Sequence, residues 1–552
     1  MRRLLYLLLI LSIGSTLRAQ PNLHSDDWQA DLRYLQHTVH KDYSQLFHKI
    51  TSDDFDAAVE KLYQRIPTLA KHEIVVGLAE IVSLFGYGHT ALWLTSWRYN
   101  HGVDFHQMPY NLYHFTDGTY VQGVHKDYAD ALGAKVIRIG ATPVADALAA
   151  VKPVFSAEND QFFKAHGLHY LGVPEILHAK EVIEDVAAVT LTLEKEGREF
   201  TVDFAARKTD QFPGYYGIIQ AGEEWLDARQ TEPTPLWLKH LDKKYFYEYL
   251  GEEKTVYVRQ SEIQDDDEQN IPAFYAEVFD FIEANEVEKM VLDVRLNSGG
   301  NNYKNKPIIT GIIESEKINQ PGKFYVVLGR RTFSACQNLV NELENYTEAI
   351  FVGEPTGENV NFFGDTRTVT LPNSKLPVRL SYLWWQDKDP RDDRPWTPPH
   401  VAVDLSFQDY TSNHDPVMEA ILGMSDADPV KEPWSHLVEL FNAGDIENLK
   451  QAAHVYVKDS KFRYYDFEDR INSAGYDLMG ADRFEEARAV FALNAELYPD
   501  SANCWDSLAE SHWKSGEKDK ATEYYNKAIS LDPDGPIGEN ARTMLRQMQF
   551  GH

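Results

Sequence analysis

Residues 329–337 read Gly-Arg-Arg-Thr-Phe-Ser-Ala-Cys-Gln and join two stretches of different hydrophobic period. The apolar run before them, Phe324-Tyr-Val-Val-Leu328, is typical of a buried strand, and Ser334–Tyr346 has the spacing of a helix. Ser334 would therefore lie at a helix N-terminus, where unpaired backbone N–H groups can stabilise an oxyanion. The hydroxyl is a candidate nucleophile. The alternative is that it only caps the helix, a frequent role of serine.

Strands and helices alternate around this junction, over residues 254–425. Before it come a helix at 272–284 and a strand at 290–294, and a further strand follows at 349–352. Alternation of this kind predicts an α/β domain with largely buried strands.

Three glycine-containing segments accompany the serine. Two of them follow predicted strands, Asp293-Val-Arg-Leu-Asn-Ser-Gly-Gly300 and Val352-Gly-Glu-Pro-Thr-Gly357, and the third is Gly88-His89-Thr90. Glycine lets backbone N–H groups approach a ligand closely, although it also serves wherever a tight turn needs positive φ.

Together these segments resemble the tail-specific (C-terminal processing) serine peptidases and their tricorn-type relatives. That family shows Asp-x-Arg-x-Asn-x-Gly-Gly, then Ser-Ala at the start of a helix, then Val-Gly-Glu-x-Thr, and this chain has all three in order. The resemblance covers about residues 30–425. It implies a crotonase-like (ClpP/crotonase) spiral ββα core and peptide-bond hydrolysis through a serine acyl-enzyme, with no cofactor and no metal.

The resemblance also suggests the partners of Ser334. The processing branch takes a lysine base just after the third motif, but no lysine occurs here before Lys375. In the tricorn-type branch the base is a histidine in a short segment that Gly88-His89-Thr90 matches, so His89 is the expected general base. An acidic residue orients that histidine, and its place falls on Asp393 or its neighbour Asp392, with Asp393 favoured by spacing; local pairing with arginine is the alternative. The backbone N–H groups of Ala335 and of Gly299 or Gly300 would form the oxyanion hole.

The N-terminus predicts export. Arg2 and Arg3 precede the apolar run Leu4–Leu11, and cleavage after Ala19 would complete a signal peptide over residues 1–19. A membrane anchor is the competing interpretation, but the run is too short to span a bilayer. The formal net charge of −31 argues against nucleic acid or an anionic membrane as a partner.

The remaining sequence predicts a multidomain chain. The expected parts are an N-terminal helical domain with His89 (20–117), a PDZ-like module with an insertion (118–205), a connector (206–253), the α/β peptidase core (254–425) and tetratricopeptide repeats (426–552). The repeats follow from an offset of 34 residues that aligns Ile471 with Trp505 and Ala487 with Ala521. Cys336 and Cys504 are expected to be buried apolar residues.

These observations favour an exported, periplasmic or secreted serine peptidase acting on polypeptides, with Ser334, His89 and Asp393 as its triad. The repeats add a possible protein partner. The main alternative is an inactive peptide- or protein-binding scaffold that uses the PDZ-like module and the repeats. A weaker one is an acyl-CoA enzyme of the crotonase type, against which the absence of a basic phosphate-binding cluster counts.

Overall fold

The computed structural model describes residues 23–95, 105–208, 214–230, 232–424 and 433–550. The predicted signal peptide, residues 1–19, lies outside these ranges. Within them, no helix combines the length and the apolar character needed to cross a bilayer.

Three amphipathic helices begin the described chain: α1 (Ser25–Asp42), α2 (Ser52–Arg65) and α3 (Lys71–Ser83). Helix α3 is buried along almost its whole length. The chain then turns through Gly86, which has φ +65°. Beyond this turn, Ala91 pairs with Arg379 in an isolated antiparallel bridge.

A seven-stranded antiparallel sheet follows, in the order β11-β3-β4-β6-β7, with β2 beside β3 and β5 beside β4. Its strands are β2 (Tyr110–Phe115), β3 (Gly118–His125), β4 (Lys135–Ile139), β5 (Thr142–Pro143), β6 (Ala188–Lys195), β7 (Arg198–Ala205) and β11 (Trp225–Asp227). Helix α4 (Val144–Val151) and the insertion that ends in α6 (Pro174–Ala179) pack between this sheet and α3. The sheet therefore extends beyond the predicted limits of 118–205 at both ends, and the PDZ-like assignment stays a prediction.

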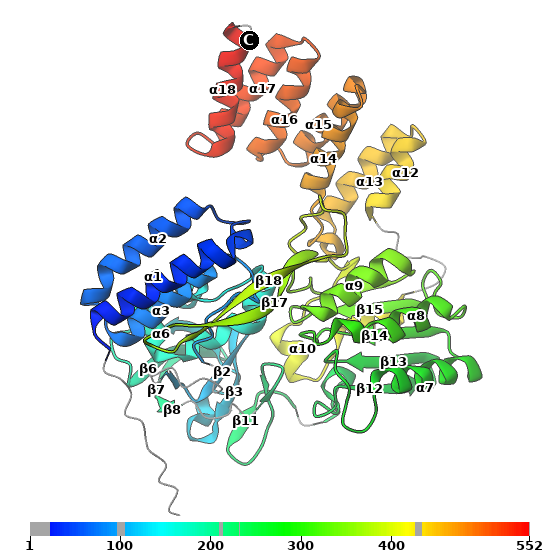
Figure 1. Ribbon diagram of the computed structural model, residues 1–552. Helices are drawn as coiled ribbons and strands as arrows, with labels where there is room; N and C mark the ends of the chain where they lie inside the picture. Colours follow the sequence, from blue (N-terminus) through cyan, green and yellow to red (C-terminus); the bar gives the residue numbers. More distant parts are fainter. Residues whose placement is uncertain (1–22, 96–104, 209–213, 231, 425–432, 551–552) are drawn as a thin grey trace, which may run out of the picture.

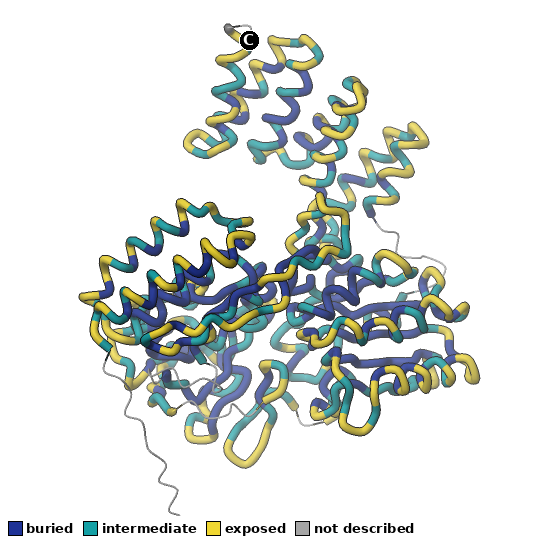
Figure 2. The backbone as a smooth tube through the Cα atoms, in the orientation of Figure 1, coloured by how far each residue is buried: buried dark blue, intermediate teal, exposed yellow. Residues whose placement is uncertain are grey.

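The α/β core is a six-stranded sheet in the order β12-β13-β14-β15-β16-β19, parallel except for the pair β12–β13. Its strands are β12 (Tyr245–Leu250), β13 (Thr255–Gln260), β14 (Lys289–Asp293), β15 (Phe324–Leu328), β16 (Ile350–Gly353) and β19 (Val401–Ala402), and its main helices are α7 (Ile271–Ala284), α8 (Lys306–Glu314) and α9 (Ala335–Tyr346). The central strands are buried on both faces (Figure 2). Alternation in the sequence predicted this domain, while the spiral, crotonase-like description of it stays a prediction.

A long hairpin links the α/β core to the N-terminal helices. Strands β17 (Asn361–Thr370) and β18 (Pro377–Gln386) leave the core and run across the molecule to α1 and α3 (Figure 1). Four apolar side chains of its far half belong to the same core cluster as those helices: Leu371, Leu376, Val378 and Leu380. Buried Asp31 on α1 accepts hydrogen bonds from the backbone N–H groups of Asn373 and Ser374, at 2.8 and 2.7 Å.

The C-terminal part is a stack of antiparallel helices, drawn from yellow through orange to red in Figure 1. They are α12 (Pro433–Asn442), α13 (Ile446–Lys458), α14 (Phe467–Gly480), α15 (Phe484–Leu497), α16 (Ala502–Lys514), α17 (Lys518–Leu531) and α18 (Pro536–Phe550). The pairs α14–α15 and α16–α17 are the helix pairs that the offset of 34 residues predicted, and the final helix α18 packs against α17. Both cysteines are free and buried, as expected, with Cys336 in α9 and Cys504 in α16.

Candidate active site

Ser334 lies at the junction between β15 and α9, in a backbone conformation that side chains rarely adopt. Its φ is +58° and its ψ is −128°. The hydroxyl makes no capping hydrogen bond to α9, so the cap interpretation is not borne out. Strained residues of this kind occur where a fold holds a functional group in a fixed position.

His89 lies in the turn after α3 and is held in place by the hairpin. The next residue, Thr90, is fully buried; its hydroxyl donates to Ser381 Oγ at 3.0 Å and accepts from the Ser381 N–H at 3.1 Å. On the other side, a Cβ on Gly88 would lie 2.8 Å from the ring of Phe162, so only glycine fits there. Residues far apart in sequence therefore determine where the imidazole points.

The imidazole reaches the serine. His89 Nε2 lies 3.0 Å from Ser334 Oγ, although 245 positions separate the two residues. The ring stacks on Phe333, with a centroid distance of 4.5 Å, and lies nearly parallel to the ring of Phe362 at 5.9 Å. This packing fixes the ring plane, and it shields the imidazole from water.

Burial changes the proton affinity of the histidine. It lowers the pKa of His89 to about 3, and the positive charge of Arg379 contributes in the same direction. The imidazole is therefore neutral at physiological pH, which is the form that can accept a proton from a serine hydroxyl.

Glu358 is the acidic residue beside this pair. Its fully buried carboxylate lies 3.6 Å from His89 Nδ1, and the same oxygen accepts the Ser334 N–H at 3.0 Å. Sequence reasoning missed Glu358, although it stands directly after the Gly-rich motif at 352–357. The available signal was an acid at the place where a lysine was sought.

A second buried carboxylate lies next to Glu358. Glu158 accepts the N–H of Gly88 at 2.9 Å, and the Lys49 ammonium approaches it to 3.6 Å. Burial raises the pKa of both carboxyls, and the neighbouring Glu158 raises that of Glu358 further. Lys49 opposes the rise at both carboxyls and ranks higher among the influences on Glu158, so Glu358 has the stronger tendency to bind a proton.

Asp393 does not reach His89. It is exposed, and it lies near enough to Asp469 of α14 to raise the pKa of that carboxyl. Asp392 pairs with Arg394 at 2.8 Å, as the local-pairing alternative predicted. Spacing in the sequence favoured Asp393, whereas the carboxylate that lies beside His89 in the structure is that of Glu358.

The backbone donors around Ser334 divide into used and unused groups. The Gly299 N–H already donates to Asn297 Oδ1 at 2.8 Å. Within the described residues, the N–H groups of Gly300 and Ala335 have no backbone acceptor. A Cβ on Gly299 would lie 2.7 Å from Ser334 Cβ and 2.9 Å from Ala335 N, so glycine allows this loop to approach the serine.

Ser334 and His89 open onto a cleft of about 720 Å³. Its walls come from the loop after α3, the insertion, the glycine loop after β14 and the hairpin. Aromatic and aliphatic side chains dominate the lining: Trp93, Leu112, Tyr113, Phe155, Phe162, Leu168, Tyr170 and Phe333. The volume and the apolar walls suit a short peptide segment.

Two clusters in the described chain have side-chain atoms close enough to share a metal ion. They are His89 with Glu158 and Glu358, and His72 with Glu73 and His178. In the first cluster, Nε2 of the histidine already faces Ser334 and Lys49 approaches Glu158, an arrangement that suits proton transfer. The second is partly exposed, with the two imidazoles 3.0 Å apart.

Comparisons with known proteins support the C-terminal repeats and the overall fold. The tetratricopeptide repeat family matches residues 502–534, which confirms the predicted repeat at α16–α17. No curated protein sequence matches the chain.

Among solved structures, mature CPAF complexed with lactacystin aligns with 72% of this chain and 97% of its own, at 13% identity and a TM-score of 0.51. A second structure of mature CPAF covers 72% and 96%, at 12% identity and a TM-score of 0.50. The photosystem II D1 C-terminal processing protease covers 73% and 99%, at 12% identity and a TM-score of 0.34. The two CPAF structures show that the resemblance expected from the motifs is a likeness of fold over the mixed α/β part of the chain. The helical repeats rest on the family match alone.

Proposed function

We propose that the chain is a serine peptidase that cleaves polypeptides through an acyl-enzyme on Ser334. The observation that carries the proposal is the 3.0 Å contact between His89 Nε2 and Ser334 Oγ, made by two segments that the hairpin brings together. A hydroxyl next to a neutral imidazole is the arrangement that activates serine as a nucleophile.

In the proposed mechanism, Ser334 Oγ attacks the scissile carbonyl carbon while its proton passes to His89 Nε2. The negative charge that develops on the carbonyl oxygen is stabilised by the N–H groups of Ala335 and Gly300, the unused donors beside the serine. His89 then protonates the leaving amine, and the acyl-enzyme forms. Water activated by His89 attacks the ester carbon in the second half of the reaction and releases Ser334.

Glu358 completes this triad. When His89 takes the serine proton, Nδ1–H of the imidazolium faces the carboxylate at 3.6 Å, a contact that must shorten for a hydrogen bond to form. This stabilisation requires the ionised form of Glu358, and a positive charge on the ring favours that form. Because Glu358 also holds the Ser334 N–H, it positions nucleophile and base together.

Export to the periplasm or the outside belongs to the same proposal, on the strength of the N-terminal pattern at 1–19. The helical repeats would present a binding surface to a protein partner.

Digestion of casein, an unfolded polypeptide, tests the proposed activity. We expect the wild-type chain to produce new peptides, detected by mass spectrometry, and the Ser334→Ala variant to produce none. If folded wild-type protein leaves casein intact while a labelled peptide still binds in the cleft, the scaffold alternative is favoured instead.

A further inference from the structure

The charged side chains that line the cleft are all cationic. They are Lys164 from the insertion, Arg331 from the turn before the serine and Arg379 from β18. Within the described chain, no carboxylate lies within ion-pair distance of any of the three. The lining histidines other than the base, His166 and His169, have lowered pKa values because they are buried, so they are neutral at physiological pH. A cationic cleft in a chain of net charge −31 calls for an explanation.

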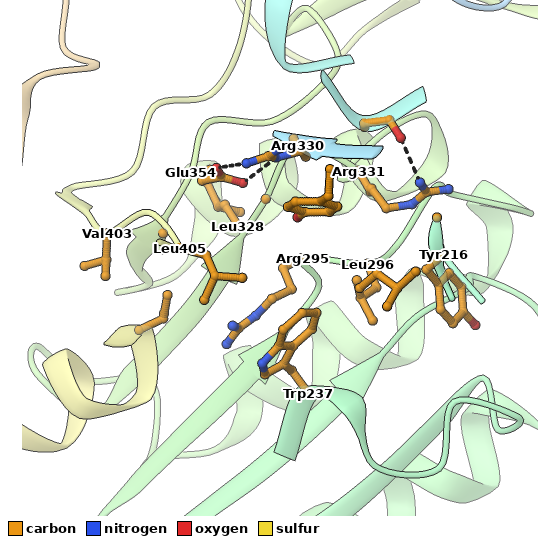
Figure 3. Close-up of a pocket in the computed structure, with 17 residues that line it drawn as sticks. Tyr216, Trp237, Arg295, Leu296, Leu328, Arg330, Arg331, Glu354, Val403 and Leu405 are labelled. Atoms are coloured by element: carbon orange, nitrogen blue, oxygen red, sulfur yellow. Dashed lines mark hydrogen bonds and ion pairs between the residues drawn. The ribbon is translucent and has the colours of Figure 1, made fainter. Parts of the chain in front are cut away.

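Arg331 differs from the arginines around it. Arg330 makes a bidentate ion pair with Glu354, and Arg295 pairs with Asp293 and Asp415. Arg331 instead donates from Nη1 to the carbonyl oxygen of Ala165 at 3.0 Å, and its Nε has no acceptor. Figure 3 shows both arrangements: two dashed lines join Arg330 to Glu354, and one joins Arg331 to a carbonyl.

The position of Arg331 connects it with the catalytic serine. It stands three residues before Ser334, and both side chains line the same cleft. Arg331 also borders a smaller cavity of about 60 Å³, where Tyr216 lies beside it (Figure 3). Gly217 makes room for the guanidinium, since a Cβ there would lie 2.9 Å from Nη1.

An unpaired guanidinium in such a place is costly to the free protein. Burial lowers the pKa of Arg331 to about 10, and the neighbouring Arg330 adds to this effect. Arg331 is partly buried, and its Nε is buried without an acceptor. A guanidinium in this environment without a carboxylate partner destabilises a fold, so its presence favours a role in binding. Arg379 also lacks a carboxylate partner in the described chain. Its guanidinium donates hydrogen bonds to Thr366 Oγ1 and lies over the ring of Trp93, at 4.6 Å from the ring centroid.

We propose that Arg331, assisted by Arg379 and Lys164, binds a carboxylate of the polypeptide in the cleft. The guanidinium fork matches a carboxylate in geometry, and the aromatic walls take the apolar residues on either side of it. The carboxylate comes from an Asp or Glu side chain near the scissile bond or from the C-terminus of the peptide. This inference rests on the proposed peptidase function for its substrate, but it concerns binding and is tested without hydrolysis.

The test measures binding to the Ser334→Ala variant by fluorescence anisotropy. Four fluorescein-labelled decapeptides share one apolar sequence and carry Glu or Gln at the centre, each with a free or an amidated C-terminus. We expect the peptides with a carboxylate to bind about tenfold more tightly than the Gln amide, because a charge-assisted contact is gained. The Glu amide and the Gln acid then identify which carboxylate is bound.

Adding Arg331→Gln should reduce the carboxylate preference to within about twofold, whereas Arg391→Gln should leave it unchanged. Arg391 is a matched control because its side chain is 87% exposed and pairs with Asp389 outside the cleft lining. Arg379→Gln should also reduce the preference for peptides that carry a carboxylate. If Arg331→Gln does not fold, the result for Arg379→Gln tests the proposal instead. Equal binding of all four peptides, no binding at all, or a preference that survives in every folded cleft variant would overturn the proposal. Because casein digestion is measured in a separate experiment, a failure of the peptidase proposal can be distinguished from a failure of the carboxylate-binding proposal.

Discussion

Ser334 carries its hydroxyl on a backbone that favours glycine. A non-glycine residue at φ +58° and ψ −128° costs about 1–3 kcal/mol, and the surrounding fold has to hold it there. Phe333 on one side and Ala335 on the other are both buried, so the turn cannot relax without disturbing the core.

We therefore expect Ser334→Gly to be more stable than Ser334→Ala by about 1 kcal/mol, because glycine removes the strain and alanine retains it. Urea unfolding of the two variants measures the difference. At Ser298, which is outside the set of positive-φ residues, the order should be reversed. Equal stability of the two Ser334 variants would contradict the claim that the backbone at this position is strained.

The electrostatics of the triad predict a pH effect. In the proposed mechanism, Glu358 must be ionised to stabilise the imidazolium. Because its pKa is raised, serine reactivity should fall as the pH drops through that pKa. The fall in reactivity at low pH is the acid limb of the pH–rate profile. Protonation of His89 does not determine where this limb lies, since the pKa of His89 is about 3. Glu158→Gln removes a negative neighbour, which lowers the pKa of Glu358 and should move the acid limb to lower pH.

The rate of fluorophosphonate labelling against pH measures this shift. Asp160→Asn is the control, since Asp160 lies nearby in sequence but is exposed and pairs with Lys152. An acid limb that stays in place or moves to higher pH in Glu158→Gln would refute the assigned coupling.

The motifs predicted two of the three residues brought together here. Ser334 and His89 lie in short segments with recognisable local patterns, whereas Glu358 was missed and Asp393 chosen instead. The reason is physical: local patterns identify turns and helix starts, but which carboxylate faces an imidazole depends on contacts between distant segments. The unused N–H groups of Gly300 and Ala335 are likewise a matter of tertiary geometry.

At the scale of elements, the β17–β18 hairpin determines the position of His89. It leaves the α/β core, packs among the N-terminal helices and binds Thr90 through Ser381. Nothing in the local sequence shows where a hairpin will dock, so this connection was not foreseen. The same holds for β2 and β11, which join a sheet expected to span 118–205; short strands take their pairing from tertiary context.

Thr90→Val tests the role of this contact. Valine keeps the shape but leaves the Ser381 N–H and hydroxyl without their partner in a buried site, at a cost of about 1–3 kcal/mol. Displacement of His89 should also slow labelling about ten- to a hundredfold. Urea unfolding and labelling kinetics check both effects, with exposed Thr68→Val as the control. Unchanged labelling would mean that the hairpin does not position the base.

At the scale of the whole molecule, the repeats join the core through a small set of polar contacts. Arg463 and the hydroxyl of Tyr464 both reach the carboxylate of Asp404, each at 2.8 Å. The cleft has no lining residue from α12 to α18. The offset of 34 residues was sufficient to predict the repeats, because their packing is local, but not their attachment to the core.

Asp404→Ala should therefore loosen the repeats without affecting the serine. We expect the apparent stability of the repeats to fall by about 1–3 kcal/mol, seen as a calorimetric transition at lower temperature, while labelling continues at the wild-type rate. Asp500→Ala, an exposed change within the repeats, is the control. A parallel loss of labelling would show that the repeats support the site.

The central claim, an activated Ser334 with His89 as its base, is tested most directly by a fluorophosphonate probe. The wild-type protein should be labelled on Ser334, mapped by mass spectrometry, and labelling should be lost in Ser334→Ala and in His89→Ala, with both variants shown to be folded by circular dichroism. Folded wild-type protein that takes no label, or a Ser334→Ala variant that labels as fast as wild type, would contradict the account.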